Sequence, residues 1–202
     1  MIIHKIFFKL SFYYHQWLAK ICILPAVLAG LKIGSDSVVG KTFFSWPHQV
    51  SIGKNCILES YINFRYDGVW NPGPSIIIDD NVYIGANSEF NICSDIHIGK
   101  DALIASGCKF IDHNHGYQSL STPIRLQPPD VAAIRISNNV WLGTNVIVLK
   151  GVKIGYGSIV AAGSVVTKSI PSMEIWGGVP AKKISIRKDE DINNHMRMSG
   201  TF

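Results

Sequence analysis

The sequence predicts an all-β protein, a left-handed parallel β-helix built from hexapeptide repeats. Large aliphatic residues recur every six positions, and a small or β-branched residue recurs four positions after each of them. A period of six is neither helical nor a simple strand alternation, so it fits a short strand followed by a corner. Three such units close a triangular turn of about eighteen residues, and each turn buries its core only by stacking on its neighbours.

The repeat is clearest in the second half of the chain. There the aliphatic position is occupied by Ile136, Leu142, Val148, Ile154, Val160 and Val166, and the second inward position by Val140, Val146, Val152, Ser158 and Ser164. Upstream the same pattern occurs at Ile52/Gly53/Cys56, Ile84/Gly85/Ser88, Ile98/Gly99/Ala102 and Ile104/Ala105/Cys108. So many units in one phase argue against coincidence. The glycine after the aliphatic is expected to ease a positive φ at the corner.

The coil is expected to cover residues 33–185, followed by a short C-terminal tail over 186–202. Two segments break the repeat, 64–75 and 112–133, and both are rich in proline, glycine or polar residues. We expect them to be loops that leave the coil. Loops held by a rigid scaffold are where binding and catalytic residues are usually found.

Residues 1–32 have a different composition, with apolar and aromatic residues, several lysines and no acidic residue. The apolar run Ile21–Leu31 has eleven residues and contains Pro25, which is too short to span a bilayer. The segment predicts an amphipathic helix that caps the open end of the coil. Peripheral contact with an anionic membrane is a second role for the same helix.

The composition narrows the classes of function. The chain has 202 residues, of which 47% are hydrophobic and 16% charged, and a formal net charge of +5. This suits one folded domain with an appendage, and an anionic ligand or membrane surface. The basic residues form no dense run with interleaved aromatics, which argues against nucleic acid. The four cysteines have neither a CxxC pair nor zinc-finger spacing, which indicates reduced cytosolic thiols.

The richest polar segment lies at the start of the second loop. His113 and His115 stand there in a polar sequence beside the coil, which favours a general base over a core histidine. Solvated loop histidines are the alternative. Two histidines at i and i+2, without a cysteine or carboxylate set nearby, do not complete a metal site. Asp112 is expected either to orient a ring nitrogen or to serve as a turn residue.

Two further segments are candidates for ligand contacts. Trp141 occupies an outward-facing slot, where its indole would cover a ligand or pack on a neighbouring subunit. Thr167, Lys168 and Lys182 lie near small residues at one end of the coil, which suits a phosphate-bearing ligand. An ordinary basic terminus is the alternative.

The stretch 136–184, "ISNNVWLGTNVIVLKGVKIGYGSIVAAGSVVTKSIPSMEIWGGVPAKKI", closely resembles the hexapeptide-repeat acetyltransferases. It is most similar to the branch containing galactoside, maltose, Nod-factor and bacterial surface-polysaccharide O-acetyltransferases. "IDHNHGY", followed by "TPIRLQP", looks like the active-site loop of the polysaccharide group. The resemblance covers roughly residues 33–185. It implies a homotrimer with active sites between neighbours, acetyl-CoA as the donor and no metal.

The resemblance also implies roles for individual residues. His113 matches the catalytic histidine, and the acceptor side is implied to include Asn91, His115 and Trp141. Contacts to acetyl-CoA are implied for Thr144, Ala162, Thr167, Lys168 and Lys182. The chain departs from the family at Trp176, where a small residue is usual. It also lacks the N-terminal signature of the maltose type, which argues against a small free sugar as acceptor.

The predicted function is therefore acetyl transfer from acetyl-CoA to a hydroxyl of a sugar in a bacterial surface polysaccharide or its precursor. His113 would act as general base, and an amide near Thr144 would bind the oxyanion. Three alternatives stay open: an N-acetyltransferase acting on an amino sugar or nucleotide sugar, a metal-dependent enzyme like the γ-carbonic anhydrases, and a non-catalytic β-helix. The expected location is the cytoplasm, with the protein peripheral on the inner face of the membrane.

Overall fold

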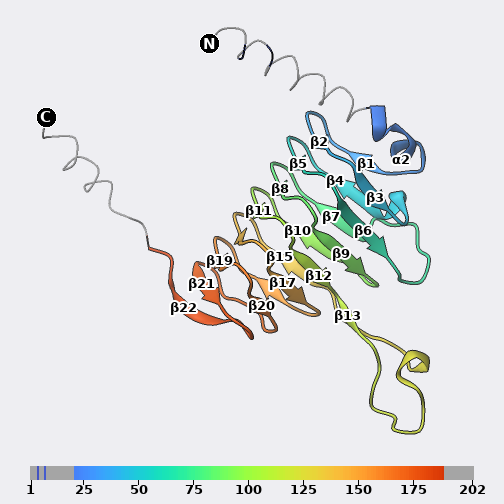
Figure 1. The fold of residues 1–202 in the computed structure, drawn as a ribbon, viewed down its shortest axis with the longest axis vertical. Helices are drawn as coiled ribbons and strands as arrows, with labels where there is room; N and C mark the ends of the chain where they lie inside the picture. Colours follow the sequence, from blue (N-terminus) through green and yellow to red (C-terminus); the bar gives the residue numbers. More distant parts are fainter. Residues whose placement is uncertain (1–3, 5–6, 8–20, 189–202) are drawn as a thin grey trace, which may run out of the picture.

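The protein is a left-handed parallel β-helix, as the repeat predicted. The structure is a computed structural model that describes residues 4, 7 and 21–188. Three sheets of six, eight and six strands form the faces of a triangular prism, and the chain visits them in rotation (Figure 1). The strands of successive turns pair in parallel, so each turn of the chain lies on the one before it.

The strands are short, as corners every few residues require. Sheet A contains β1 (Lys32–Ile33), β4 (Val50–Ile52), β7 (Ile76–Ile78), β10 (Ile96–Ile98), β15 (Ile134–Ile136) and β18 (Lys153–Ile154). Sheet B contains β2 (Val38–Val39), β5 (Ile57–Leu58), β8 (Tyr83–Ile84), β11 (Leu103–Ile104), β16 (Trp141–Leu142), β19 (Ile159–Val160), β21 (Glu174–Gly177) and β22 (Lys182–Ile186). Sheet C contains β3 (Thr42–Phe44), β6 (Ile62–Tyr66), β9 (Glu89–Ile92), β12 (Lys109–Ile111), β17 (Ile147–Leu149) and β20 (Val165–Val166).

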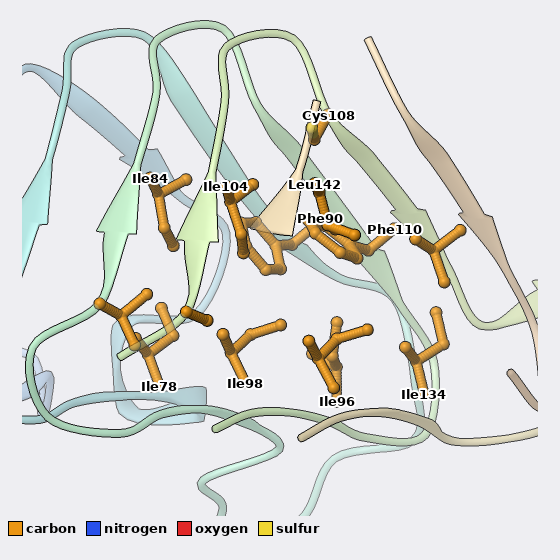
Figure 2. Close-up of a cluster of buried hydrophobic side chains, with 14 of the residues drawn as sticks. Ile78, Ile84, Phe90, Ile96, Ile98, Ile104, Cys108, Phe110, Ile134 and Leu142 are labelled. Carbon is orange, nitrogen blue, oxygen red and sulfur yellow. The ribbon is translucent and has the colours of Figure 1, made fainter. Parts of the chain in front are cut away.

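The aliphatic position of each repeat points into the prism, and the side chains of successive turns stack in columns (Figure 2). The first four strands of sheet C, β3, β6, β9 and β12, carry phenylalanine in this position, and the last two, β17 and β20, carry Val148 and Val166. Phe64, Phe90 and Phe110 are fully buried, with neighbouring ring centroids 4.7 Å apart. Phe44 extends the stack at 5.3 Å from Phe64. This column is the bulkiest part of the core.

The glycine that follows the aliphatic position has a different role from the one expected. A Cβ added at Gly143 would lie 2.6 Å from the Ala162 nitrogen of the next turn, and its φ is not positive. The glycine is therefore needed because two turns approach closely there. The positive φ at the corners is taken three positions after the aliphatic residue, by asparagine, as at Asn87 and Asn145, or by glycine, as at Gly107 and Gly157. Asparagine tolerates the left-handed region better than most residues with a side chain.

Both segments that break the repeat leave the coil at the corner between sheets C and A, but the first begins later than predicted. Residues 64–66 belong to β6, because Phe64 and Tyr66 point into the core. The second segment forms an arm over residues 113–133. Its base is a two-residue antiparallel ladder between β13 (His113–Asn114) and β14 (Asp130–Val131), and its tip includes the 3-10 helix η2 (Ile124–Leu126) (Figure 1).

The described part of the N-terminal segment closes the first turn of the coil. Helix α2 (Leu24–Leu28) follows Ile23, and the side chains of Ile23, Ala26 and Val27 pack against the core. Most of the predicted amphipathic helix over 1–32 lies outside the described residues. No helix in the described ranges is long and apolar enough to cross a membrane.

At the other end, the hairpin β21–β22 adds two strands to sheet B, and Trp176 packs against the core. Trp176 therefore helps to close the last turn, and its Nε1 donates a hydrogen bond to Glu174 at 2.7 Å. The tail predicted over 186–202 lies mainly outside the described residues.

Candidate active site at the corner between sheets C and A

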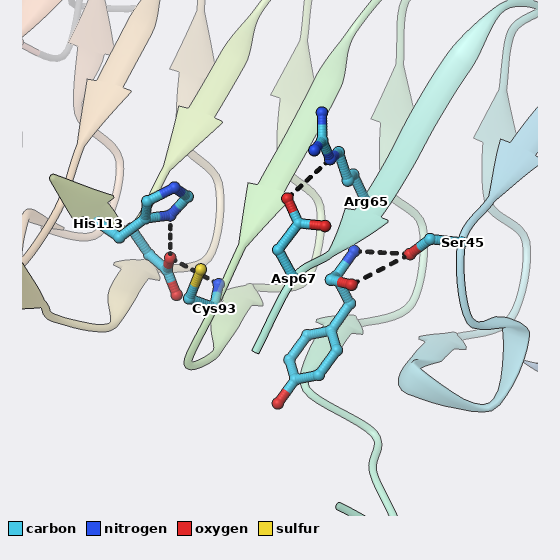
Figure 3. A network of polar contacts seen from close by, with 7 residues as sticks. Ser45, Arg65, Asp67, Cys93 and His113 are labelled. Atoms are coloured by element: carbon cyan, nitrogen blue, oxygen red, sulfur yellow. Dashed lines mark hydrogen bonds and ion pairs between the residues drawn. The ribbon is translucent and has the colours of Figure 1, made fainter. Parts of the chain in front are cut away.

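Asp112 and His113 stand where the arm leaves β12, one turn above the corner formed by residues 93–95. Asp112 is completely buried, and its carboxylate accepts hydrogen bonds from the backbone N–H groups of Cys93 at 2.8 Å and Ser94 at 2.7 Å. It also binds His113 Nδ1 at 3.1 Å (Figure 3). One carboxylate therefore joins the base of the arm to the preceding turn.

This arrangement orients the His113 ring. In the neutral ring the Nδ1–H donates to Asp112, so Nε2 carries the lone pair. The described residues give Nε2 no hydrogen-bond partner, and 14% of the side chain is exposed. Of the two roles considered for Asp112, the structure supports orientation of the ring nitrogen. A histidine held by a buried carboxylate, with its other ring nitrogen free of protein partners among the described residues, can act as a general base.

Asn91 lies beside this pair. It is in β9, its side chain is on the outer face of sheet C, and it stands in register with Ile111 of β12. Its backbone carbonyl oxygen accepts a hydrogen bond from the backbone N–H of Asp112 at 3.4 Å. The Oδ1 atom is buried and has no partner among the described residues. Buried polar atoms are usually paired, and the Oδ1 atom of Asn63 on β6 is a second exception on the same sheet.

Cys93 was not predicted to approach a base, yet it does. Its sulfur, an Asp112 oxygen and a His113 nitrogen all lie within 4.8 Å of one another. Burial, the Asp112 charge and then the Asp67 charge raise the pKa of the Cys93 thiol to about 11. The thiol is therefore protonated at neutral pH, and both Asp112 oxygens are occupied by N–H donors. These features favour a hydrogen-bonded cluster over a thiolate nucleophile.

We expect Cys93 to react slowly with iodoacetamide at pH 7.5, because the thiolate is the nucleophile and a pKa of about 11 leaves very little of it. Burial also raises the pKa of Cys108 to about 11, whereas Cys22 is exposed. Mass spectrometry of the alkylated protein should find Cys22 modified first. Rapid alkylation of Cys93 at pH 7.5 would mean that its thiol is activated and would contradict a raised pKa.

Two residues implied to contact the donor lie together at a different corner, between sheets B and C. Thr144 and Ala162 are exposed and occupy equivalent positions on successive turns, and the Gly163 N–H donates to the Thr144 carbonyl at 2.8 Å. The N–H groups of Gly143 and Asn145 are bound to neighbouring turns. The Thr144 N–H has no acceptor within the described ranges, so it is free for a ligand.

The remaining predicted residues are spread over the surface. Thr167 and Lys168 are exposed at the C–A corner, two turns beyond His113, and Lys182 is exposed in β22. His115 is exposed in the arm and is not part of the Asp112 cluster. Trp141 is 47% exposed on the outer face of sheet B. In a three-sided prism this face lies opposite the C–A corner, so Trp141 and His113 of one chain do not meet.

Comparison with known proteins places the chain in a family. The family model described as bacterial transferase hexapeptide (six repeats) matches residues 133–168, and that of the hexapeptide repeat of succinyl-transferase matches residues 75–108. "Putative lipopolysaccharide biosynthesis O-acetyl transferase WbbJ" of Escherichia coli K12 is 42% identical over 116 residues, which cover 54% of this chain and 59% of that protein. The chain belongs to the hexapeptide-repeat acetyltransferase family.

Other members of the family show how far the similarity extends. The galactoside O-acetyltransferase of Escherichia coli K12 is 33% identical over 144 residues, covering 70% of this chain and 66% of that enzyme. A probable acetyltransferase of Mycobacterium tuberculosis is 33% identical over 114 residues, covering 56% of this chain and 38% of that protein. The chain thus spans less than two thirds of the length of WbbJ and of the mycobacterial relative.

Solved structures share the fold. AntD, an N-acyltransferase from Bacillus cereus solved with dTDP and coenzyme A, has a TM-score of 0.67 at 21% identity and covers 85% of this chain and 93% of its own. At that identity the match concerns the fold alone. The hexapeptide-repeat acetyltransferase VCA0836 from Vibrio cholerae, complexed with acetyl coenzyme A, has a TM-score of 0.53 at 26% identity and covers 79% of this chain and 73% of its own.

Proposed function

We propose that this protein transfers an acetyl group from acetyl-CoA to a hydroxyl of a sugar in a bacterial surface polysaccharide or its precursor. The observation that carries the proposal is His113, whose Nδ1 is held by the buried Asp112 carboxylate while Nε2 has no partner among the described residues. A sugar hydroxyl is a poor nucleophile at neutral pH, and a base within hydrogen-bond reach removes that difficulty.

The reaction we propose proceeds without an acetyl-enzyme. The hydroxyl oxygen attacks the thioester carbonyl carbon as Nε2 of His113 takes the hydroxyl proton. The tetrahedral oxyanion then collapses, the carbon–sulfur bond breaks, and the imidazolium returns the proton to the coenzyme A sulfur. Asp112 keeps its charge throughout and stabilises the imidazolium that forms. The high pKa of Cys93 supports direct transfer, because the thiol that lies closest to the base is not ionised at neutral pH.

The oxyanion requires a donor, and the unoccupied N–H of Thr144 is our candidate. Ala162, on the following turn, would lie beside the pantetheine end of the donor, and the lysines at positions 168 and 182 would lie near its phosphates. Within one chain the B–C corner, which carries Thr144 and Ala162, is separated from His113 by the width of sheet C. At roughly 3.3 Å per residue, a strand and its flanking residues keep the two corners more than about 10 Å apart.

For this reason we propose a homotrimer whose active sites lie between neighbouring chains. A second copy would bring its B–C corner, with Thr144, and its face B, with Trp141, to the C–A corner of the first. The outer face of sheet B supports this arrangement, because it carries a continuous apolar row in register on successive strands. The row consists of Val38, Ile57, Tyr83, Leu103, Trp141, Ile159 and Ile175.

A shared site predicts complementation between two inactive variants. His113→Ala and Trp141→Ala should each lose most of their activity, because each removes one side of every site. When the two chains are co-expressed with different affinity tags and mixed trimers are purified, some sites contain both wild-type residues and activity should return. Mixed trimers that stay as inactive as the parents would contradict a site between chains.

The test of the proposed reaction is release of free thiol from acetyl-CoA in the presence of sugars, nucleotide sugars and polysaccharide fragments. Release that needs a hydroxylated glycan would support O-acetylation. Release that needs an amino sugar would instead favour the N-acetyltransferase, and AntD is named an N-acyltransferase. A chelator should leave the rate unchanged, because the proposed step uses His113 as the base and needs no metal ion. Failure to bind coenzyme A at all would refute the proposal.

We also propose that the protein works in the cytoplasm, where acetyl-CoA is made, and that it meets a lipid-linked acceptor at the inner face of the membrane. The exposed side chains of Leu24 and Leu28 on α2 support a contact at this end of the coil. Flotation with anionic liposomes tests it, and a protein that stays unbound with residues 1–32 intact would count against membrane contact.

A further inference from the structure

A hollow of about 70 Å³ opens at the same C–A corner, two turns before the arm. Trp46, Gln49, Tyr66, Gly68 and Trp70 line it. They come from the 3-10 helix η1 (Pro47–Gln49) with the residue before it, from the end of β6 and from the loop 67–75. The catalytic proposal uses none of these residues. Aromatic walls with a few fixed polar groups are the usual composition of a small-molecule site.

Gln49 supplies the polar wall of the hollow. The residue is 1% exposed, and its Nε2 donates to the Asn71 carbonyl at 2.7 Å and to His48 Nε2 at 3.1 Å. These contacts fix which end of the amide is the oxygen. That oxygen, Oε1, is buried and has no hydrogen-bond partner within the described residues. It faces Gly73 of the loop, where an added Cβ would lie 2.8 Å from it, so Oε1 lies below the open surface of the hollow.

The two tryptophans supply the apolar walls. Trp46 is 50% exposed and Trp70 is 70% exposed, although neither is needed to cover the core. His48 lies between them, with ring centroids 5.8 Å from Trp46 and 6.4 Å from Trp70. The loop that carries Trp70 is fixed at its base, because Tyr66 Oη donates to the Val69 carbonyl at 2.9 Å and accepts from Asn71 at 2.6 Å. Exposed indoles on an ordered loop offer flat faces for a ring to stack on.

The hollow shares a wall residue, Gly68, with the surroundings of the proposed catalytic cluster. Gly68 forms part of its wall and packs so closely on the Cys93 carbonyl oxygen that a Cβ would overlap it. The Cys93 N–H is in turn bound to Asp112, the carboxylate that holds His113. Figure 3 shows Asp67, at the start of the loop, between β6 and the Cys93–His113 cluster. A chain-like ligand lying along this corner would therefore pass both places.

We propose that the hollow is a subsite for a second pyranose residue of an extended glycan acceptor, next to the sugar that is acetylated at His113. The ring would stack on Trp70 or Trp46, with its hydroxyls toward Gln49 and Tyr66, the polar residues of the lining. This inference rests on the proposed O-acetyl transfer. A lipid chain fits the site less well, because Gln49 and Tyr66 line the hollow together with the indoles.

The test combines a binding measurement with acceptor kinetics. In protein labelled with ¹⁵N-tryptophan, the indole signals of Trp46 and Trp70 are assigned by Trp→Phe variants. Lacto-N-neotetraose, maltotetraose and chitotetraose are then titrated in, with anionic phosphatidylglycerol vesicles as a separate sample. At least one tetrasaccharide should shift both signals, and the shift should persist in His113→Ala. This result does not depend on activity, so it separates failure of the subsite from failure of the proposed function.

Kinetics with the same tetrasaccharide and its terminal monosaccharide complete the test. Trp70→Ala should raise KM for the tetrasaccharide about tenfold, the loss of one stacking contact, and leave kcat/KM for the monosaccharide unchanged. Trp70→Phe should recover most of the loss. Tyr61→Ala is the control, since Tyr61 is 64% exposed at another corner of the same turn.

Three results would overturn the subsite. The first is that none of the three tetrasaccharides shifts the indole signals. The second is that the vesicles shift them and the saccharides do not, which would make the hollow a membrane contact. The third is that Trp70→Ala impairs both acceptors equally.

Discussion

Replacing His113 with alanine is expected to lower the rate of acetyl transfer by about 10² to 10⁴, the usual contribution of a general base. The side chain is only partly exposed and lies at the base of the arm, outside the stacked core, so the fold should survive the change. Coenzyme A binding and the sedimentation coefficient of the assembly should therefore match the wild type. Thiol release at saturating acetyl-CoA measures the loss.

His115→Ala is the matched control for this prediction. The residue is two positions further along the same arm, is exposed, and is not part of the Asp112 cluster. It should keep wild-type turnover within a factor of a few. If His115→Ala lost activity and His113→Ala kept it, the base would be the other histidine. If both variants were fully active, neither would be the base.

The second large effect concerns stability. Phe90→Ala should lower the free energy of unfolding by about 3–5 kcal/mol, because it removes a buried aromatic side chain and leaves a cavity. Phe90 is fully buried and stacks on Phe64 and Phe110 at 4.7 Å on either side. One substitution thus removes both contacts at the middle of the column. Urea unfolding followed by far-ultraviolet circular dichroism measures the change.

Phe43→Ala is the control for the core substitution. Phe43 is 60% exposed on the outer face of the same sheet, so its removal should change stability by less than about 0.5 kcal/mol. Equal destabilisation by Phe43→Ala and Phe90→Ala would show that the phenylalanine column is not the feature that holds the turns together.

The repeat predicted the fold well because each hexad carries its own signal. Residues such as Leu142, Val148 and Ile154 are spaced by the repeat itself, and all are buried. The boundary of the first loop was predicted less well. Arg65, Tyr66 and Asp67 have the composition of a loop, but Tyr66 continues the inward alternation of β6. A six-residue pattern does not indicate where a strand continues beyond its own repeat unit.

The sequence suggested His113 and left Asp112 with two roles. It did not indicate Cys93 as a neighbour, because that contact joins residues nineteen positions apart. The spacing was nevertheless a usable signal, since about one turn of the coil separates the two residues and stacked turns bring such positions together. The hollow beside Gln49 could not have been predicted, because an unpaired amide oxygen depends on side-chain geometry and not on residue type.

The arm leaves and rejoins the coil without altering the register on either side of it. Ile96 pairs with Ile134 and Lys109 pairs with Ile147, as though the intervening segment were an ordinary corner. Lengthening such an excursion costs little, about 0.6 kcal/mol for each doubling of its length. Evolution can therefore exchange one arm for another while the scaffold keeps folding. Acceptor preference would then diverge faster among relatives than the coil that supports it, and grafting the arm is a direct route to an altered specificity.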